Sequence, residues 1–233
     1  RLSQLVNDPT IIVEYPDGDK YYTRTITTQQ STTGCIFVLT KDIDMSSVAF
    51  SGIGTTSKSK GFNGTFYGNG HKIKNVSITL TGTSPQGFFG SVDSSGTISD
   101  VTIENLTVGG DSSSAQYIGG LVGYLNGGKI DNCNIKNVKI AGISSSVSSS
   151  GAIVPRGGLV GFSNNGIISN SNFTGEISII NNTSTYNTSR IGGLVGYAKS
   201  ATIENCFVDA NMSGVFDGFI GDASFLTISN CST

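Results

Sequence analysis

The sequence predicts an all-β protein whose strands wind into a parallel β-helix of about six or seven coils. The first observation is a repeated pentapeptide: Gly-Gly-Leu-Val-Gly stands at residues 119–123, 157–161 and 192–196. The second is a tetrapeptide that begins seven residues after the last glycine of each copy and reads Ile-Asp-Asn-Cys, Ile-Ser-Asn-Ser or Ile-Glu-Asn-Cys. The third is the alternation of apolar and polar residues around these tetrapeptides, which is the period of a strand with one buried face.

The spacing of the repeats predicts coils of different length. Degenerate copies at residues 87–90 and 218–221 extend the array, so the closing glycines are Gly90, Gly123, Gly161, Gly196 and Gly221. Successive closing glycines lie 33, 38, 35 and 25 residues apart. The shortest step fits one three-sided coil, and we expect the longer steps to contain loops, where insertions are tolerated. The expected loops are 144–151 and 181–189, followed by 109–116 and 51–59.

Asparagine is expected to form one corner of each coil. It interrupts the alternation in every tetrapeptide, and it tolerates the left-handed backbone conformation that a sharp corner needs. Its amide is expected to bond to the next coil, which would give a ladder down one edge. The predicted ladder contains Asn75, Asp100, Asn132, Asn170, Asn205 and Asn230. The Gly-Gly pairs predict a second tight bend, where a side chain would clash.

Residues 1–34 do not match the repeat and are expected to cap the first coil. Leu2, Leu5 and Val6 predict one face of a short helix, which the following Asp-Pro would end. Residues 11–15 and 20–26 are rich in β-branched and aromatic residues, and the turn-forming residues between them predict a hairpin. The predicted organisation is therefore a cap over 1–34 and one β-helix domain over 35–233.

The glycine-rich pentapeptides resemble the repeat of the GLUG-motif proteins. Residues 38–44 and 62–73 are similar to the segment that commonly precedes those repeats, so the resemblance covers roughly residues 35–231. It implies a right-handed parallel β-helix found in secreted or surface proteins, some adhesive and some fused to peptidase domains. It implies no catalytic residue, because the motif is structural in that family. The non-repeating N-terminus and the degenerate copy at 218–221 depart from the pattern, which leaves open a cell-surface protein or a component of a larger assembly such as a virus particle.

Composition and charge argue against several functions. The formal charge is −2 and the 14 Lys and Arg residues are scattered, which predicts no nucleic-acid partner. No apolar run is long enough to span a bilayer, which predicts no membrane insertion. His71 is the only histidine, so neither a catalytic triad nor a multi-histidine metal site is expected, and no cofactor is expected.

Three of the four cysteines share one predicted column, because Cys133, Cys206 and Cys231 each follow the corner asparagine. Equivalent residues of stacked coils lie about 4.8 Å apart, which is within the Cα range of a disulfide. Two interpretations stay open at this stage: a ladder of buried thiols, or a disulfide between Cys206 and Cys231 if their coils are neighbours.

Acidic residues offer the main enzymatic alternative. Asp131 and Glu204 share a column, but Ser169 stands between them. Their backbones would then lie about 10 Å apart, which is too far for a catalytic pair unless the side chains converge. Asp42 and Asp44 have the alternation of a calcium site, yet no third acid follows at loop spacing, so a turn is favoured.

Aromatic residues and glycosylation sequons offer contacts with sugars. Tyr124, Phe162 and Tyr197 share a column and are expected to pack on one another, with a sugar-stacking platform as the alternative. Of the Asn-x-Ser/Thr sequons, Asn181 and Asn187 lie in a predicted loop and are the expected glycosylation sites if the chain passes a eukaryotic secretory route.

The predicted function is that of a non-enzymatic structural module that is extracellular, on a cell surface or on a virus particle. It would present loops and contact a partner through its C-terminal coil, because an uncovered coil end is an adhesive edge. The expected partner is another protein or further copies of the chain, with glycans as a further partner. The residues expected at this contact are Phe216, Phe219, Ile220, Phe225 and Leu226. Two alternatives stay open: a carbohydrate-active β-helix enzyme with clustered Asp and Lys or Arg in a groove, and a glycan-binding adhesin with outward aromatic residues.

Overall fold

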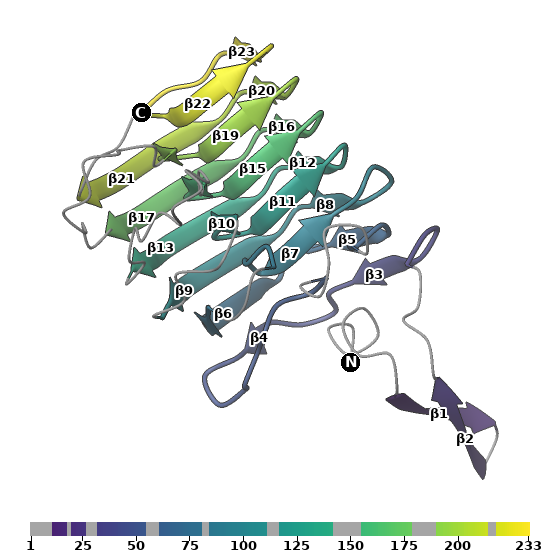
Figure 1. The fold of residues 1–233 in the computed structure, drawn as a ribbon. Helices are drawn as coiled ribbons and strands as arrows, with labels where there is room; N and C mark the ends of the chain where they lie inside the picture. The colour runs from purple at the N-terminus through teal and green to yellow at the C-terminus, as the bar shows by residue number, and fades with distance from the viewer. Residues whose placement is uncertain are drawn as a thin grey trace.

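The computed structural model describes residues 11–17, 20–26, 32–54, 61–80, 84–110, 117–141, 155–178, 190–213 and 218–233. These residues form strands and turns and no helix. Beyond an N-terminal hairpin, neighbouring strands pair in parallel and stack into a parallel β-helix (Figure 1). The fold class expected from the repeats is thus confirmed.

The strands belong to four parallel sheets and the hairpin. The three-stranded sheet contains β10 (Ile118–Gly119), β14 (Arg156–Gly157) and β18 (Ile191–Gly192). The five-stranded sheet contains β7 (Phe89–Val92), β11 (Val122–Asn126), β15 (Val160–Asn164), β19 (Val195–Lys199) and β22 (Ile220–Ser224). The seven-stranded sheet contains β3 (Ile36–Val38), β5 (Thr65–Tyr67), β8 (Thr97–Ser99), β12 (Lys129–Asp131), β16 (Ile167–Ser169), β20 (Thr202–Glu204) and β23 (Thr227–Ser229). The six-stranded sheet contains β4 (Ile43–Asp44), β6 (Lys72–Thr79), β9 (Thr102–Gly109), β13 (Asn134–Ala141), β17 (Asn172–Ser178) and β21 (Phe207–Ser213).

Each complete coil passes through these sheets in the same order. In one coil the chain runs from β10 to β11, β12 and β13, one strand in each sheet, and β14 then starts the next coil. The seven-stranded sheet contributes one strand to every coil, so the described residues form seven coils. The register places equivalent residues above one another, as Ile130 lies opposite Ile168 and Ile168 opposite Ile203. Side chains at one repeat position therefore form columns along the axis.

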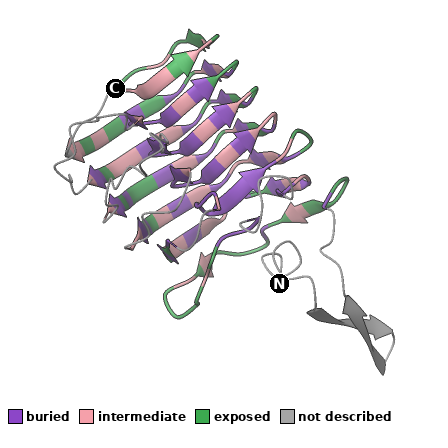
Figure 2. Cartoon of the chain, viewed as in Figure 1, coloured by how far each residue is buried: buried purple, intermediate pink, exposed green. Residues whose placement is uncertain are grey.

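The inward columns make one continuous apolar core. The inner isoleucines of the seven-stranded sheet are fully buried and stack on one another: Ile98, Ile130, Ile168 and Ile203. Figure 2 shows buried positions interspersed with half-buried and exposed ones along the strands, as expected when a strand has one inner face. In the first coils aromatic rings fill the same space, and Phe62 and Phe66 contact Phe89 with ring centroids 5.2 and 5.4 Å apart.

The first glycine of each Gly-Gly pair forms a bend that admits no side chain. A Cβ added at Gly192 would lie 2.1 Å from the carbonyl oxygen of Val195, and a Cβ at Gly157 would lie 2.1 Å from that of Val160. Since van der Waals contact needs well over 3 Å, the chain turns from the three-stranded into the five-stranded sheet only with glycine at this place.

The N-terminal hairpin forms a sheet of its own. Strand β1 (Ile11–Asp17) pairs antiparallel with β2 (Lys20–Ile26), and Tyr15 lies opposite Tyr22. The expected short helix before it lies outside the described residues, as do the expected loops at 144–151 and 181–189. The capping role of residues 1–34 therefore stays a prediction.

Candidate functional site

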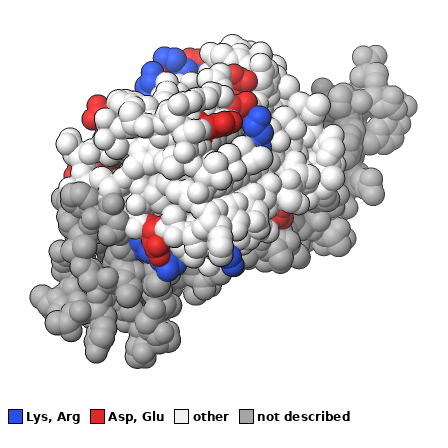
Figure 3. All heavy atoms as spheres, turned by 90° about the horizontal axis from the view of Figure 1, so that it is seen from above, with Lys and Arg blue, Asp and Glu red and all other residues white. Residues whose placement is uncertain are grey.

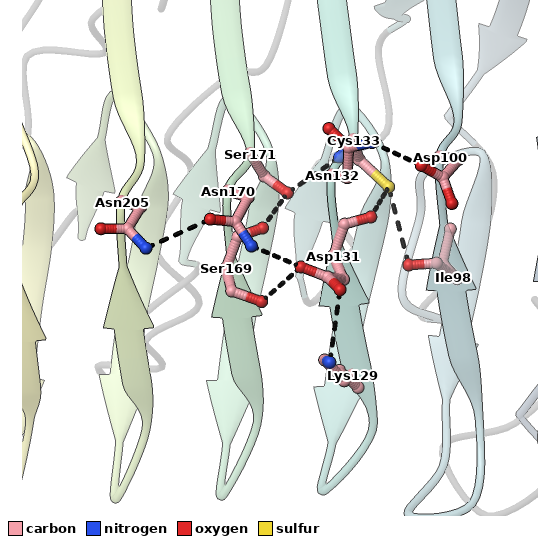
Figure 4. A network of polar contacts seen from close by, with 10 residues as sticks. All are labelled: Ile98, Asp100, Lys129, Asp131, Asn132, Cys133, Ser169, Asn170, Ser171 and Asn205. Atoms are coloured by element: carbon pink, nitrogen blue, oxygen red, sulfur yellow. Dashed lines mark hydrogen bonds and ion pairs between the residues drawn. The ribbon is translucent and has the colours of Figure 1, made fainter. Parts of the chain in front are cut away.

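The corner between the seven-stranded and six-stranded sheets carries a ladder of amides and carboxylates. Its asparagines adopt the left-handed conformation, with φ of 50° at Asn132, 51° at Asn170 and 53° at Asn205. The amide of Asn205 donates to Oδ1 of Asn170 at 3.1 Å, and Asn132 donates to Oδ1 of Asp100 (Figure 4). At the last coil the amide of Asn230 donates to Oδ1 of Asn205 at 3.2 Å. Each amide therefore donates to the coil that precedes it in the chain.

The ladder shifts by one residue where it reaches Asp131. The amide of Asn170 donates to Oδ1 of Asp131 at 2.8 Å, and Oγ of Ser169 donates to the same oxygen at 2.7 Å. Nζ of Lys129 lies 3.3 Å from the other carboxylate oxygen (Figure 4). The hydrogen bonds from Asn170 and Ser169, followed by that from Lys129, lower the pKa of Asp131. A carboxyl group held in its ionised form accepts hydrogen bonds and is poorly suited to donate a proton to a leaving group.

Asn75 lies in a second ladder, so its assignment to the corner column was wrong. It lies within β6, in register with Asn105 of β9 and Asn137 of β13, and Gly68 occupies the corner of its coil. Asn75 donates to Oδ1 of Asp44 at 3.1 Å, Asn105 to Asn75 at 3.0 Å and Asn137 to Asn105 at 2.6 Å. These asparagines also have positive φ. The corner column and this second column thus both contain asparagines that recur along the sequence at nearly the same interval. Only the strand register shows to which column a given asparagine belongs.

The cysteines after the corner point into the coil. Ser171 stands between Cys133 and Cys206 in their column, and Cys231 follows Cys206 directly, as the backbone bonds between these coils show. The N–H of Cys133 donates to Oγ of Ser171 at 3.0 Å, and that of Cys206 contacts Sγ of Cys231 at 3.4 Å. The cysteines of the described residues are free thiols. Burial raises the pKa of Cys133 to about 12 and that of Cys206 to about 11, which leaves both thiols protonated at neutral pH.

The acids considered for catalysis do not converge among the described residues. Asp131 and Glu204 lie on separate strands, with Ser169 between them in register. Burial raises the pKa of Asp93, which sits at the end of β7; its Oδ2 accepts from the N–H of Gly61 at 3.1 Å, and its Oδ1 is buried without a hydrogen bond. Its carboxylate also interacts with the amide of Asn126 from the next coil. A glycosidase needs two carboxyl groups that face one sugar, and these acids do not supply that pair.

The turn with Asp42 and Asp44 is held by protein groups. Asp42 accepts from the N–H of Lys72 at 3.0 Å and pairs with Nζ of Lys74 at 3.1 Å, and these contacts lower its pKa. His71 approaches the same carboxylate, with Nδ1 at 3.5 Å. Asp44 accepts from the N–H two residues further on at 2.9 Å, as in a turn closed by its own side chain. In the described ranges we find no group of three or more His, Cys, Asp or Glu placed to hold a metal ion.

The aromatic column on the outside of the five-stranded sheet is a stack of rings whose faces meet. Phe162 lies between Tyr124 and Tyr197, with centroids 5.2 and 4.9 Å apart and ring planes inclined by 28° and 21°. The guanidinium of Arg190 lies 3.8 Å from the centroid of Tyr197 and pairs with Asp222 at 2.6 Å. Sugars stack on the faces of aromatic rings. Because these faces contact one another or Arg190, the geometry favours packing over a sugar platform.

An apolar cavity of about 640 Å³ opens beside the first two coils. It is lined by apolar side chains and Ser51, and the apolar lining includes Phe37, Leu39, Met45, Phe50 and Phe88. A ligand site usually adds a few converging polar groups that fix orientation, and this lining supplies little of that kind. The cavity is therefore described best as the N-terminal opening of the core.

Charged side chains are sparse on the surface. Figure 3 shows a largely uncharged face with small groups in which acids and bases lie close together. Such pairs include Lys72 and Glu104, with Nζ and Oε1 2.8 Å apart. Nucleic-acid sites usually present an extended basic patch, which this face lacks. In the part of the chain that the structure describes, we find no helix long and apolar enough to cross a membrane.

The C-terminal coil exposes an aromatic residue in an unusual conformation. Phe225 is 85% exposed and has a φ of 55°. Its place in the preceding coils is taken by Gly127, Asn165 and Ser200, which are smaller. A bulky residue with positive φ is uncommon and strained, and the sequence pattern did not signal this conformation. The other residues expected at a contact are half-buried, namely Phe219, Ile220 and Leu226, while Phe216 lies outside the described residues, as do Asn181 and Asn187.

These columns define the class of the protein, a parallel β-helix repeat protein. Residues 114–141 and 187–212 match the GLUG motif, and they contain the coils that begin with β10 and β18. The chain therefore carries GLUG repeats, as its glycine-rich pentapeptides indicate. A stretch of 90 residues, or 39% of this chain, is 31% identical to halomucin of Haloquadratum walsbyi (strain DSM 16790 / HBSQ001). The matched stretch spans 1% of halomucin.

Proposed function

We propose that the chain is a non-enzymatic structural module of an extracellular or cell-surface protein. The observation that carries this proposal is that outward polar and aromatic side chains contact side chains of the adjacent coil. The corner amides, the amides within the six-stranded sheet and the aromatic rings each form such a column. Side chains that bond to neighbouring coils stabilise the β-helix and are not free to bind a substrate. The similarity to halomucin and the GLUG repeats support a surface role.

The state of the acids supports the same proposal. Asp131 and Asp42 accept hydrogen bonds that lower their pKa, whereas a general acid that works near neutral pH needs a raised pKa. Asp93 has the raised pKa, but its Oδ2 accepts a hydrogen bond from the N–H of Gly61 within the protein. A carbohydrate-active enzyme is therefore the weaker alternative.

We further propose that the module makes an assembly contact through its C-terminal coil. Strands β21, β22 and β23 each lie at the edge of their sheet, so their outer backbone groups face away from the stack. Phe225 and Ile228 are 85% and 47% exposed on this coil. A strained aromatic residue on an exposed edge fits a binding role, because its cost of about 1–3 kcal/mol needs compensation. In a solution of the 233-residue chain, this compensation would come from a dimer in which two copies contact each other through the same coil across a two-fold axis.

Sedimentation of the chain and of Phe225→Asn tests the assembly proposal. Asparagine occupies this place in an earlier coil as Asn165 and accepts the positive φ. We expect dimers of the unchanged chain at micromolar concentration, and monomers of equal or higher thermal stability for the variant. A monomer at all concentrations up to about 100 μM, a range in which specific contacts form, would reject the two-fold contact.

Incubation with polysaccharides tests the non-enzymatic proposal. We expect no change in reducing ends or in unsaturated products over a panel of acidic and neutral polysaccharides. Depolymerisation that is lost in Asp93→Asn and retained in Asp209→Asn, an exposed acid of β21, would establish the enzymatic alternative instead.

A further inference from the structure

The last two coils bring two cysteines into direct register. Cys206 and Cys231 follow the corner asparagines of adjacent coils, and the N–H of Ser232 donates to the carbonyl of Cys206 at 3.0 Å. The N–H of Cys206 lies 3.4 Å from Sγ of Cys231. Directly opposed residues of neighbouring strands have Cα atoms about 4.8 Å apart, which a disulfide can bridge.

We propose that Cys206 and Cys231 are a redox site, at which a small disulfide oxidant cross-links the last coil to the coil before it. The proposal stands on this geometry and does not depend on the proposed function. It assigns a specific role to two of the four cysteines and predicts that the other two stay outside the bond.

The side-chain orientations define the movement that the bond requires. Sγ of Cys231 points to the preceding coil, at 3.9 Å from the carbonyl oxygen of Ile203 and beside the N–H of Cys206. Sγ of Cys206 also points to the coil before its own, with the carbonyl oxygen of Ile168 at 3.9 Å. Cys206 must therefore rotate about χ1 toward Cys231. The contacts that it gives up are weak S–H bonds, so the rotation costs little.

The order of the reaction follows from accessibility. Cys231 is half-buried on the terminal coil, whereas Cys206 is 2% exposed and its thiol has a raised pKa. Cys231 therefore reacts first: it gives its proton to solvent, its sulfur attacks one sulfur of oxidised glutathione, and one glutathione thiolate is released. Cys206 then loses its proton to solvent and attacks the Cys231 sulfur of this mixed disulfide, which releases the second glutathione thiolate. Two electrons pass from the protein thiols to the oxidant, and two reduced glutathione molecules form.

The same column contains a matched negative control. Cys133 has the environment of Cys206, including an Sγ contact to the carbonyl oxygen two residues before it, at 3.3 Å in Cys133 and 3.2 Å in Cys206. Its next-coil neighbour is Ser171, which cannot form a disulfide. Two coil spacings, or about 10 Å, separate Cys133 from Cys206, which is beyond disulfide range. Register with a second cysteine therefore distinguishes the two sites, together with the position of Cys206 beside the last described coil and the deeper burial of Cys133.

The experiment uses the full chain with Cys35→Ser, which removes the exposed thiol. The reduced protein is treated with oxidised glutathione under native conditions, alkylated, and analysed by intact mass and by peptide mapping without reductant. We expect loss of two thiols, one peptide pair joined through Cys206 and Cys231, and an unmodified Cys133. We also expect the unfolding midpoint to fall by several degrees when the bond is reduced, because a cross-link restricts the unfolded chain.

Two variants in the same background decide the assignment. Cys231→Ser should abolish both the joined peptides and the effect of reductant, whereas Cys133→Ser should keep both. Serine already occupies this column as Ser171, so the substitutions are compatible with the fold. Glutathione retained on Cys231 without a joined peptide, a bond that includes Cys133, or no reaction of Cys206 after prolonged oxidation would each overturn the proposal.

Discussion

The amide of Asn170 bonds to the carboxylate of Asp131, 2.8 Å away, and not to Asn132, the asparagine that shares its corner position. Asn132 bonds instead to Asp100. The corner ladder is therefore not formed by corner residues alone. In one coil the amide bonds to a carboxylate one residue before the corner position. The backbone conformation at the corner stays left-handed at each of these asparagines, although the side-chain bonding partner changes.

The first prediction separates the backbone and side-chain roles of the corner. Asn170→Ala should lower the free energy of unfolding by about 2–3 kcal/mol, from the left-handed conformation and the lost hydrogen bonds together. Asn170→Gly should cost about 1 kcal/mol, because glycine accepts the same φ of 51°. Urea unfolding of both variants measures the difference. An equal decrease in the free energy of unfolding for both variants would show that the left-handed backbone conformation does not contribute to the difference.

The second prediction concerns acid stability. The pKa of Asp131 in the folded chain lies below its ordinary value of 3.8, chiefly because Asn170 and Ser169 donate to it. Its contribution is therefore complete above pH 3.8 and is lost as the pH falls through the folded-state pKa, since the unfolded chain binds the proton first. Asp131→Asn should flatten the decline of stability as the pH falls below about 4. Asp209→Asn is the control, and an equal effect in the control would assign the decline to overall charge.

The third prediction tests the aromatic stack. Phe162→Ala removes three ring contacts, with Tyr117, Tyr124 and Tyr197, and should cost about 1–3 kcal/mol. Phe162→Tyr keeps an aromatic ring in this place and should cost less than about 0.5 kcal/mol. Thermal unfolding and near-ultraviolet circular dichroism measure the two variants. A glycan array probed with the same proteins should show no binding that depends on Phe162, and sugar binding lost with the alanine variant would support an adhesin instead.

The fourth prediction concerns the glycine bend. Gly192→Ala would bring a Cβ to 2.1 Å from the oxygen of Val195, so the strand must move. We expect a loss of more than about 4 kcal/mol or failure to fold. Gly70→Ala is the control, because Gly70 has a φ of 76° but no heavy atom within 4 Å of the added Cβ, and it should cost about 1–2 kcal/mol. Soluble yield and denaturant midpoint compare the two. A mild effect at Gly192 would mean that the bend can relax.

The fold followed from the sequence because its signals recur. The isoleucine, asparagine and cysteine positions return at each coil, and the structure places each set in a column. The second asparagine ladder was missed although the sequence signals it. Asn75, Asn105 and Asn137 each follow a charged residue and precede a branched apolar one. Spacing alone could not assign Asn75, because two columns share almost one period and only strand pairing decides between them.

Contacts between coils were harder to predict than the coils themselves. That Asn170 selects Asp131 depends on side-chain reach across two strands, which no local pattern encodes. The pairing of Arg190 with both Tyr197 and Asp222 joins residues from different strands and turns. Phe225 shares the left-handed conformation of Ser200, with which it is in register, although the intrinsic preference of phenylalanine opposes this conformation.

The corner amides all donate in the same direction along the β-helix axis, so the β-helix has two chemically different ends. This difference would remain if coils were lost from one end. Each amide donates to the preceding coil, so the last described asparagine, Asn230, leaves its own side-chain oxygen for whatever lies on the other side, and Asn205 would do the same if the last described coil detached. Loss of a coil would therefore expose a new end with the same hydrogen-bonding character as the old one. Such an end can fray and reseal one coil at a time, and it offers the same chemistry to an incoming coil at any length of the rod.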